Sequence, residues 1–84
     1  MPTTPNGVPI TTHAALRMEE RHITGNQVDL AIQQGAPRPG NRPGTTEYHY
    51  RYLGGPQGNR PMCCKVVTGA DGSVVTVMRH RGHA

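Results

Sequence analysis

Histidines and arginines in this chain recur at spacings that could gather them around one phosphate group. His13, Arg17 and Arg21 follow one another at intervals of four residues, so on a helix they form a single stripe along one flank. Histidine transfers protons near neutral pH, and the arginine guanidinium matches the geometry of a phosphate. The stripe therefore offers the groups that phosphoryl-transfer chemistry requires, and it is also typical of a helix face that only contacts water.

A second set of candidates follows from strict alternation in residues 47–53 (EYHYRYL). Successive strand residues point to opposite faces, so the three tyrosines share one face. The chain has no Phe and no Trp, and only the tyrosine face supplies the bulk for a core. The opposite, open face of the predicted sheet then collects polar groups from three strands: His49, Arg51, Lys65, Thr76 and His80. A slip of one residue would exchange the two faces.

Such a face has the groups needed to cleave RNA. The reaction requires a base for the 2′-hydroxyl, an acid for the leaving 5′-oxygen, and cations for the charge on the phosphorane. We expect His13 and His80 to be the acid and base, in either order, with Arg17 holding the phosphate and Thr76 assisting. Each histidine taken singly is more often a surface residue than a catalyst. The remaining cationic groups are candidates for substrate binding: Arg21, His49, Arg51, Lys65 and Arg79.

Neither a metal nor another cofactor is expected. The chain has five acidic residues, which form no obvious cluster for a catalytic ion. The two cysteines, Cys63 and Cys64, are adjacent, which excludes a disulfide framework and makes a zinc site improbable without a second pair. We expect one buried thiol and one half-exposed thiol.

Two helices are expected to position the histidine and arginine stripe. The first covers residues 11–22, capped by Thr11 or Thr12, with Ala14, Ala15, Met18 and His22 on its apolar side. The second covers residues 24–34. Its start has a capping box of Thr24 and Gln27 and a hydrophobic staple of Ile23 and Val28, and Gly35 ends it.

Three antiparallel strands are expected to follow, over residues 47–53, 62–68 and 73–80. Asp71-Gly72 predicts a hairpin turn between the last two. We expect Met62, Cys64, Val66, Val75 and Val77 to share the tyrosine face. Residues 36–46, with three prolines and two glycines, are expected to be a loop. Residues 1–10 are interpreted as a flexible lead or linker remnant, and residues 11–84 as one α+β domain of two helices and a three- to four-stranded antiparallel sheet.

Composition limits the classes of partner. The 84-residue chain carries a formal charge of +4, which favours polyanions such as nucleic acid, or an acidic protein. No apolar run approaches the length of a membrane-spanning helix, so membrane insertion is not expected. The oligomeric state is left open.

The first half of the chain resembles a known family. The residues that carry the resemblance lie between 11 and 35: Thr12-His13-Ala14, Arg17-Met18, Arg21, Ile23-Thr24 and Val28. This pattern is similar to that of a bacterial domain family found at the C-terminal ends of large polymorphic toxins. The architecture of that family looks like the barnase/EndoU/colicin/RelE (BECR) ribonuclease superfamily, in which two helices precede a curved antiparallel sheet.

The resemblance implies a toxin of bacterial competition. Such a domain is a metal-independent endoribonuclease, secreted or delivered as part of a larger effector and acting on tRNA or another structured RNA in the target-cell cytoplasm. An acidic immunity protein would neutralise it in the producer. The family's site residues carry over by position to His13, Arg17 and Arg21, and to Thr76 and His80 on the last strand.

Two other functions fit the same composition. One is a non-enzymatic basic module that binds nucleic acid or an acidic protein, and it places no demand on His13 or His80. Its weakness as an RNA binder is that the only aromatic residues are three tyrosines expected in the core. The other is an enzyme of a different kind, such as a DNA nuclease or a nucleotidyl-transfer toxin.

Overall fold

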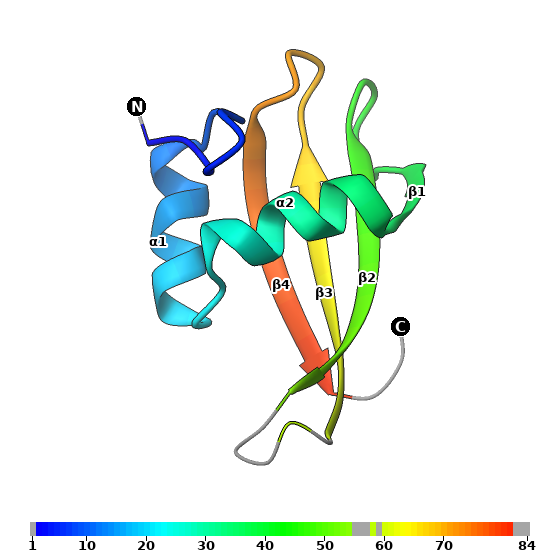
Figure 1. The fold of residues 1–84 in the computed structure, drawn as a ribbon. Helices are drawn as coiled ribbons and strands as arrows, with labels where there is room; N and C mark the ends of the chain where they lie inside the picture. Colours follow the sequence, from blue (N-terminus) through cyan, green and yellow to red (C-terminus); the bar gives the residue numbers. More distant parts are fainter. Residues whose placement is uncertain (1, 55–57, 59, 82–84) are drawn as a thin grey trace.

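The computed structural model of the chain describes residues 2–54, 58 and 60–81. Along the chain these form α1 (Thr12–Glu20), α2 (Gly25–Gln34), β1 (Ala36–Pro39), β2 (Thr46–Gly54), β3 (Arg60–Thr68) and β4 (Val74–Arg81). The strands form one sheet in the order β1-β2-β3-β4, and every neighbouring pair is antiparallel. This confirms the expected α+β fold of two helices followed by an antiparallel sheet. In Figure 1, α2 crosses one face of the sheet and α1 lies beside the edge formed by β4.

Local capping starts both helices where the sequence predicts. The Thr11 side chain accepts the Ala14 N–H at 3.1 Å. In α2, Thr24 Oγ1 accepts the Gln27 N–H at 3.2 Å while Gln27 Oε1 accepts the Thr24 N–H at 3.0 Å, which is the expected capping box. The end of α1 differs from the prediction. His22 has a φ of 55° and is exposed, because the chain turns there to enter α2, and His22 does not join the apolar side.

The tyrosine face of the sheet packs under the helices as predicted. Tyr48 is opposite Val66, which is opposite Val77, and the two valines are fully buried. Val28 and Ala31 of α2 and Ala14 of α1 complete this core, and all three tyrosines pack against it: Tyr48, Tyr50 and Tyr52.

Val75 is a correction to the predicted faces. A register shift between β3 and β4 at Val67 and Thr68 changes the alternation at the start of β4. As a result Val74, not Val75, lies in the core with no exposed surface. An irregularity of this kind, which a β-bulge produces, adds a residue to one strand and so moves its neighbours to the other face.

A fourth strand lies where a loop was expected. Ala36–Pro39 pairs with His49–Thr46 of β2, so only residues 40–45 connect the two strands. Pro37 and Pro39 are two residues apart and therefore have their nitrogens on the same side of β1. An edge strand tolerates such prolines when that side faces away from its partner. The prolines thus mark a protected edge of the sheet.

The first residues are part of the domain and not a flexible lead. Ile10 is 4% exposed and belongs to the core. Val74 donates its N–H to Pro9 O at 2.8 Å, and Thr11 donates its N–H to Val74 O at 3.0 Å. The Asn6 N–H is bonded to Asp29 Oδ2 at 3.1 Å. These contacts fasten the segment to both β4 and α2.

Both cysteines are free and buried, so the expectation of one half-exposed thiol is wrong. Cys64 lies on the helix side of the sheet within the core. Cys63 lies on the opposite face, between Arg51 and His80 in the register, and its side chain has no exposed surface. In the part of the chain that the structure describes, neither helix is long and apolar enough to cross a membrane.

The Cys64 thiol is expected to make the fold sensitive to alkali. Burial, and next the neighbouring Cys63, raises the pKa of Cys64 from an ordinary 9.0 to about 11. The unfolded chain therefore loses this proton at lower pH than the folded chain. The free energy of unfolding falls as the pH rises through the window between the two pKa values, 9.0 and about 11. We expect a loss of roughly 2–3 kcal/mol, measured by urea unfolding below and above the window. Cys64→Ala should remove this part of the pH dependence, and an unchanged dependence in the variant would contradict the assignment.

Candidate functional site

A cavity of about 330 Å³ opens on the face of the sheet opposite α2. It is bordered by residues from five elements of the fold: His13 of α1; Asn41, Arg42 and Thr45 of the β1–β2 loop; Glu47 of β2; Lys65 and Val67 of β3; and Val75, Thr76 and Met78 of β4. The strand residues share this face because Glu47 and Thr76 are both opposite Val67, and Lys65 is opposite Met78. His13 reaches it because α1 packs beside β4.

The acidic member of the cavity is held by two basic neighbours. Glu47 Oε1 lies 3.3 Å from His49 Nε2 and 3.8 Å from Lys65 Nζ. The three side chains are only 14–17% exposed, so solvent screens their interaction less than it would at the surface. Because one carboxylate oxygen faces both partners, the orientation of Glu47 within the cavity wall is defined.

His49 is on the predicted face but turns its ring toward the protein. Its Nε2 faces Glu47, and its Nδ1 is buried with no hydrogen-bond partner among the described residues. His49 does not line the cavity. Its position suits a role in orienting Glu47, whereas the sequence predicted that His49 contacts the substrate.

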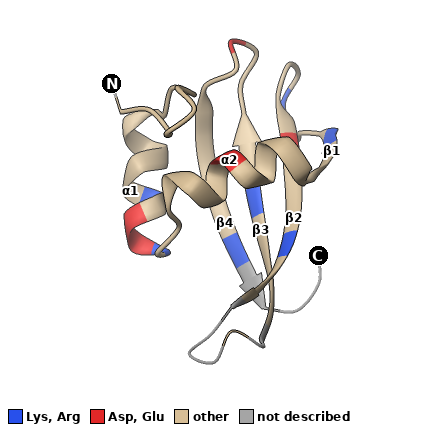
Figure 2. Ribbon diagram, in the orientation of Figure 1, with Lys and Arg blue, Asp and Glu red and all other residues tan. Residues whose placement is uncertain are grey.

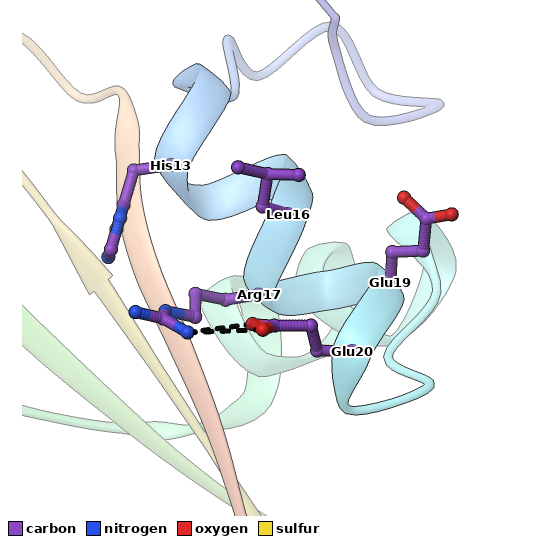
Figure 3. Close-up of a pocket in the computed structure, with 5 residues that line it drawn as sticks. All are labelled: His13, Leu16, Arg17, Glu19 and Glu20. Atoms are coloured by element: carbon purple, nitrogen blue, oxygen red, sulfur yellow. Dashed lines mark hydrogen bonds and ion pairs between the residues drawn. The ribbon is translucent and has the colours of Figure 1, made fainter.

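The helical stripe is only partly directed at this cavity. His13 is exposed and borders both the cavity and a second, open hollow of about 390 Å³ on α1, which is also lined by Arg17 and Glu20 (Figure 3). Arg17 Nη1 donates to Glu20 Oε1 at 2.7 Å, and Arg17 does not border the cavity. Arg21 caps the end of α1, where its Nη1 is buried without a partner in the described part of the chain.

The other predicted site residues divide between the two faces. Thr76 borders the cavity together with His13. Arg51 is exposed on the same face, opposite Cys63. The backbone of His80 also pairs with Cys63, about 13 Å along β4 from Thr76, and the His80 side chain lies outside the described part of the structure. Arg79 lies on the helix side, opposite Cys64, and does not share a face with Lys65 and Arg51.

The catalytic and substrate-binding residues predicted from the sequence did not include Glu47 or Arg42. Glu47 alternates with the tyrosines and stands two residues before His49, so the same pattern that selected His49 also indicated it. Arg42 makes the loop of residues 36–46 basic, and a loop of this kind is a typical place for binding residues. The position of Arg42 depends on the turn in which Thr45 donates its N–H and its hydroxyl to Arg42 O, at 3.1 and 2.6 Å.

The electrostatics of the cavity favour an anionic ligand with exchangeable protons. Lys65 and Arg42 provide cations, His13 an imidazole, Glu47 a carboxylate and Thr76 a hydroxyl. Within residues 2–54, 58 and 60–81, no group of three or more His, Cys, Asp or Glu residues is arranged to hold a metal ion.

Comparison with known proteins gives one match. A family model described as a domain of unknown function (DUF4258) matches residues 10–79, which includes both helices and every residue that borders the cavity. No curated protein and no solved structure matches the chain.

Proposed function

The chain belongs to the DUF4258 family, and we propose that it is a metal-independent endoribonuclease with its active site in the cavity beside His13. One observation carries this proposal: the cavity joins a carboxylate, an imidazole, two cations and a hydroxyl from segments far apart in the sequence. Cleavage of RNA through its own 2′-hydroxyl uses these groups together.

Glu47 and His13 are the acid–base pair in this proposal. The Glu47 carboxylate takes the proton of the 2′-hydroxyl as the 2′-oxygen attacks phosphorus. His13, in its imidazolium form, gives a proton to the 5′-oxygen as the P–O5′ bond breaks. The products are a 2′,3′-cyclic phosphate and a free 5′-hydroxyl. Glu47 replaces His80 as the partner of His13 because Glu47 borders the same cavity.

The cationic residues stabilise the charge that develops during the reaction. Lys65 and Arg42 border the cavity with Glu47, and cations aimed at the phosphorane oxygens lower the barrier most when they are already oriented. Thr76 adds a hydroxyl donor. We assign Arg51, which is exposed on the same face, to an adjacent backbone phosphate.

The biological setting is part of the same proposal. The motif of residues 11–35 resembles domains of polymorphic toxins, and the formal charge of +4 suits both an RNA substrate, such as tRNA, and an acidic immunity protein. The target-cell cytoplasm is then the place of action.

Cleavage is expected to persist in excess EDTA. The purified chain incubated with total tRNA and EDTA should yield fragments ending in 2′,3′-cyclic phosphate, detected by gel electrophoresis and by end-group analysis. Loss of cleavage on chelation, with recovery after addition of Mg²⁺, would refute the mechanism. Salt-sensitive binding of the tRNA without any cleavage would favour the non-enzymatic basic module instead.

A further inference from the structure

The helix-side face of the sheet is covered by α2 over only part of its length. Figure 1 shows α2 crossing the sheet near the middle, while β2, β3 and β4 continue past it toward Gly54, Arg60 and Arg81. Among the described elements, no helix crosses these strand ends in that view. On these strand ends Tyr52 is half-buried and Arg79 is exposed, whereas Cys64 is buried.

Two stacked tyrosines lie on this part of the face. The Tyr50 and Tyr52 rings have centroids 6.2 Å apart and planes inclined by 16°. Both side chains are half-buried and pack against the edge of the core, so each ring is held in place while part of its surface remains accessible. Rings fixed in this way bind a further aromatic group with little loss of side-chain entropy.

An exposed arginine completes the surface. Arg79 is on the same face, opposite Cys64, which is itself opposite Tyr50. Burial raises the pKa of Tyr52, and the positive charge of the nearby Arg79 guanidinium acts in the opposite direction. The Arg79 side chain is exposed to solvent. A guanidinium beside aromatic rings is suited to the phosphate that accompanies a stacked base.

The charges around this surface have one sign. The chain's five acidic residues lie on α1, on α2, at the start of β2 and in the β3–β4 turn (Figure 2). None belongs to the strand segments 50–53, 61–64 or 78–79, whose described side chains include Arg79 on the helix side and Arg51 on the opposite face. The strand ends therefore favour an anionic polymer.

We propose that Tyr50, Tyr52 and Arg79 form a platform on which unpaired bases of single-stranded RNA stack. The platform is on the opposite face of the sheet from the proposed catalytic cavity, so it would bind a part of the RNA chain away from the cleaved bond. The choice of RNA rests on the proposed function, whereas the stacking itself requires only exposed bases and a phosphate backbone, which is the combination that single-strand binders recognise.

A substrate that cannot be cleaved separates this inference from the proposed function. Binding of a fluorescein-labelled oligothymidine about ten nucleotides long is measured by fluorescence anisotropy. Tyr52→Leu, which keeps apolar bulk but removes the ring, is expected to weaken binding roughly 5- to 50-fold. Tyr52→Phe should bind within about twofold of the unmodified chain, because stacking needs the ring and not the hydroxyl. Arg79→Ala should weaken binding, whereas Arg38→Ala, an exposed arginine on β1, is the matched control.

Several outcomes would overturn the platform. One is unchanged binding by Tyr52→Leu in a folded variant, and another is equal competition by polyglutamate and oligothymidine, which would indicate binding by charge alone. If Tyr52→Leu does not fold, the unmodified chain is photocrosslinked to an oligonucleotide containing 5-iodouracil and the adduct is mapped by mass spectrometry. Adducts at Tyr50 or Tyr52 support the proposal, and adducts confined to other peptides contradict it. Absence of RNA cleavage with intact stacking would reject only the proposed catalysis.

Discussion

Replacing Glu47 by Gln, or His13 by Ala, is expected to lower RNA cleavage roughly 10²–10⁴-fold, the usual effect of losing a general base or acid. In the unmodified chain Glu47 Oε1 lies 3.3 Å from His49 Nε2. Gln keeps the size of the Glu47 side chain and an oxygen that can face His49, but it cannot take a proton. The double variant should lose far less than the product of the two single effects, because the two groups act in one step. Initial cleavage rates of a labelled RNA over a range of pH measure these effects.

Matched controls come from the outer side of α1 and its end. Glu20→Gln removes the exposed carboxylate that pairs with Arg17, and His22→Asn removes an exposed imidazole at a left-handed backbone position that asparagine tolerates. Both controls should cleave at the rate of the unmodified chain. Full activity in both His13→Ala and Glu47→Gln would remove the catalytic assignment and leave the basic binding module as the better explanation.

Replacing Ile10 by Ala is expected to destabilise the fold by about 2–5 kcal/mol, the range for truncating a buried isoleucine. That is a large share of the roughly 5–15 kcal/mol of a typical domain. Ile10 is 4% exposed in a core made mostly of small side chains, and its strand-like segment is bonded to Val74 at the edge of β4. Urea unfolding followed by far-ultraviolet circular dichroism measures the loss.

Leu16→Ala is the control for Ile10→Ala, since Leu16 is a large apolar residue that is 56% exposed. It should change the free energy of unfolding by at most about 0.5 kcal/mol. Equal effects of the two substitutions would mean that the segment of residues 2–10 does not contribute to the core as the structure describes.

Much of the architecture was predictable because it depends on residues close together in sequence. The capping box of Thr24 and Gln27 and the turn at Asp71-Gly72 are local hydrogen-bond arrangements. In that turn Gly72 adopts a φ of 85° and the Ser73 N–H donates to Asp71 Oδ1 at 3.0 Å. The alternation of tyrosines with Glu47 and His49 assigned both faces of β2 correctly, since strand geometry alone sets that period.

The elements that escaped prediction depend on distant partners. β1 has two prolines and becomes a strand only because β2 offers it an edge. Residues 2–10 show little pattern, and only β4 and α2 supply their hydrogen-bond partners. The irregularity that buries Val74 in place of Val75 arises from the pairing of β3 with β4, which no single strand's sequence encodes.

The same division applies to the candidate site. The sequence by itself determined that Lys65 and Thr76 would lie on one face of the sheet. Successive strand residues alternate strictly between the two faces, and the tyrosines occupy the buried face, so Lys65 and Thr76 take the open face. Only the tertiary structure decided that His13 joins them while Arg17 pairs with Glu20. That outcome depends on how α1 packs against the edge of β4. The spacing of residues on a helix specifies which side chains share a face, but it does not specify which element that face packs against.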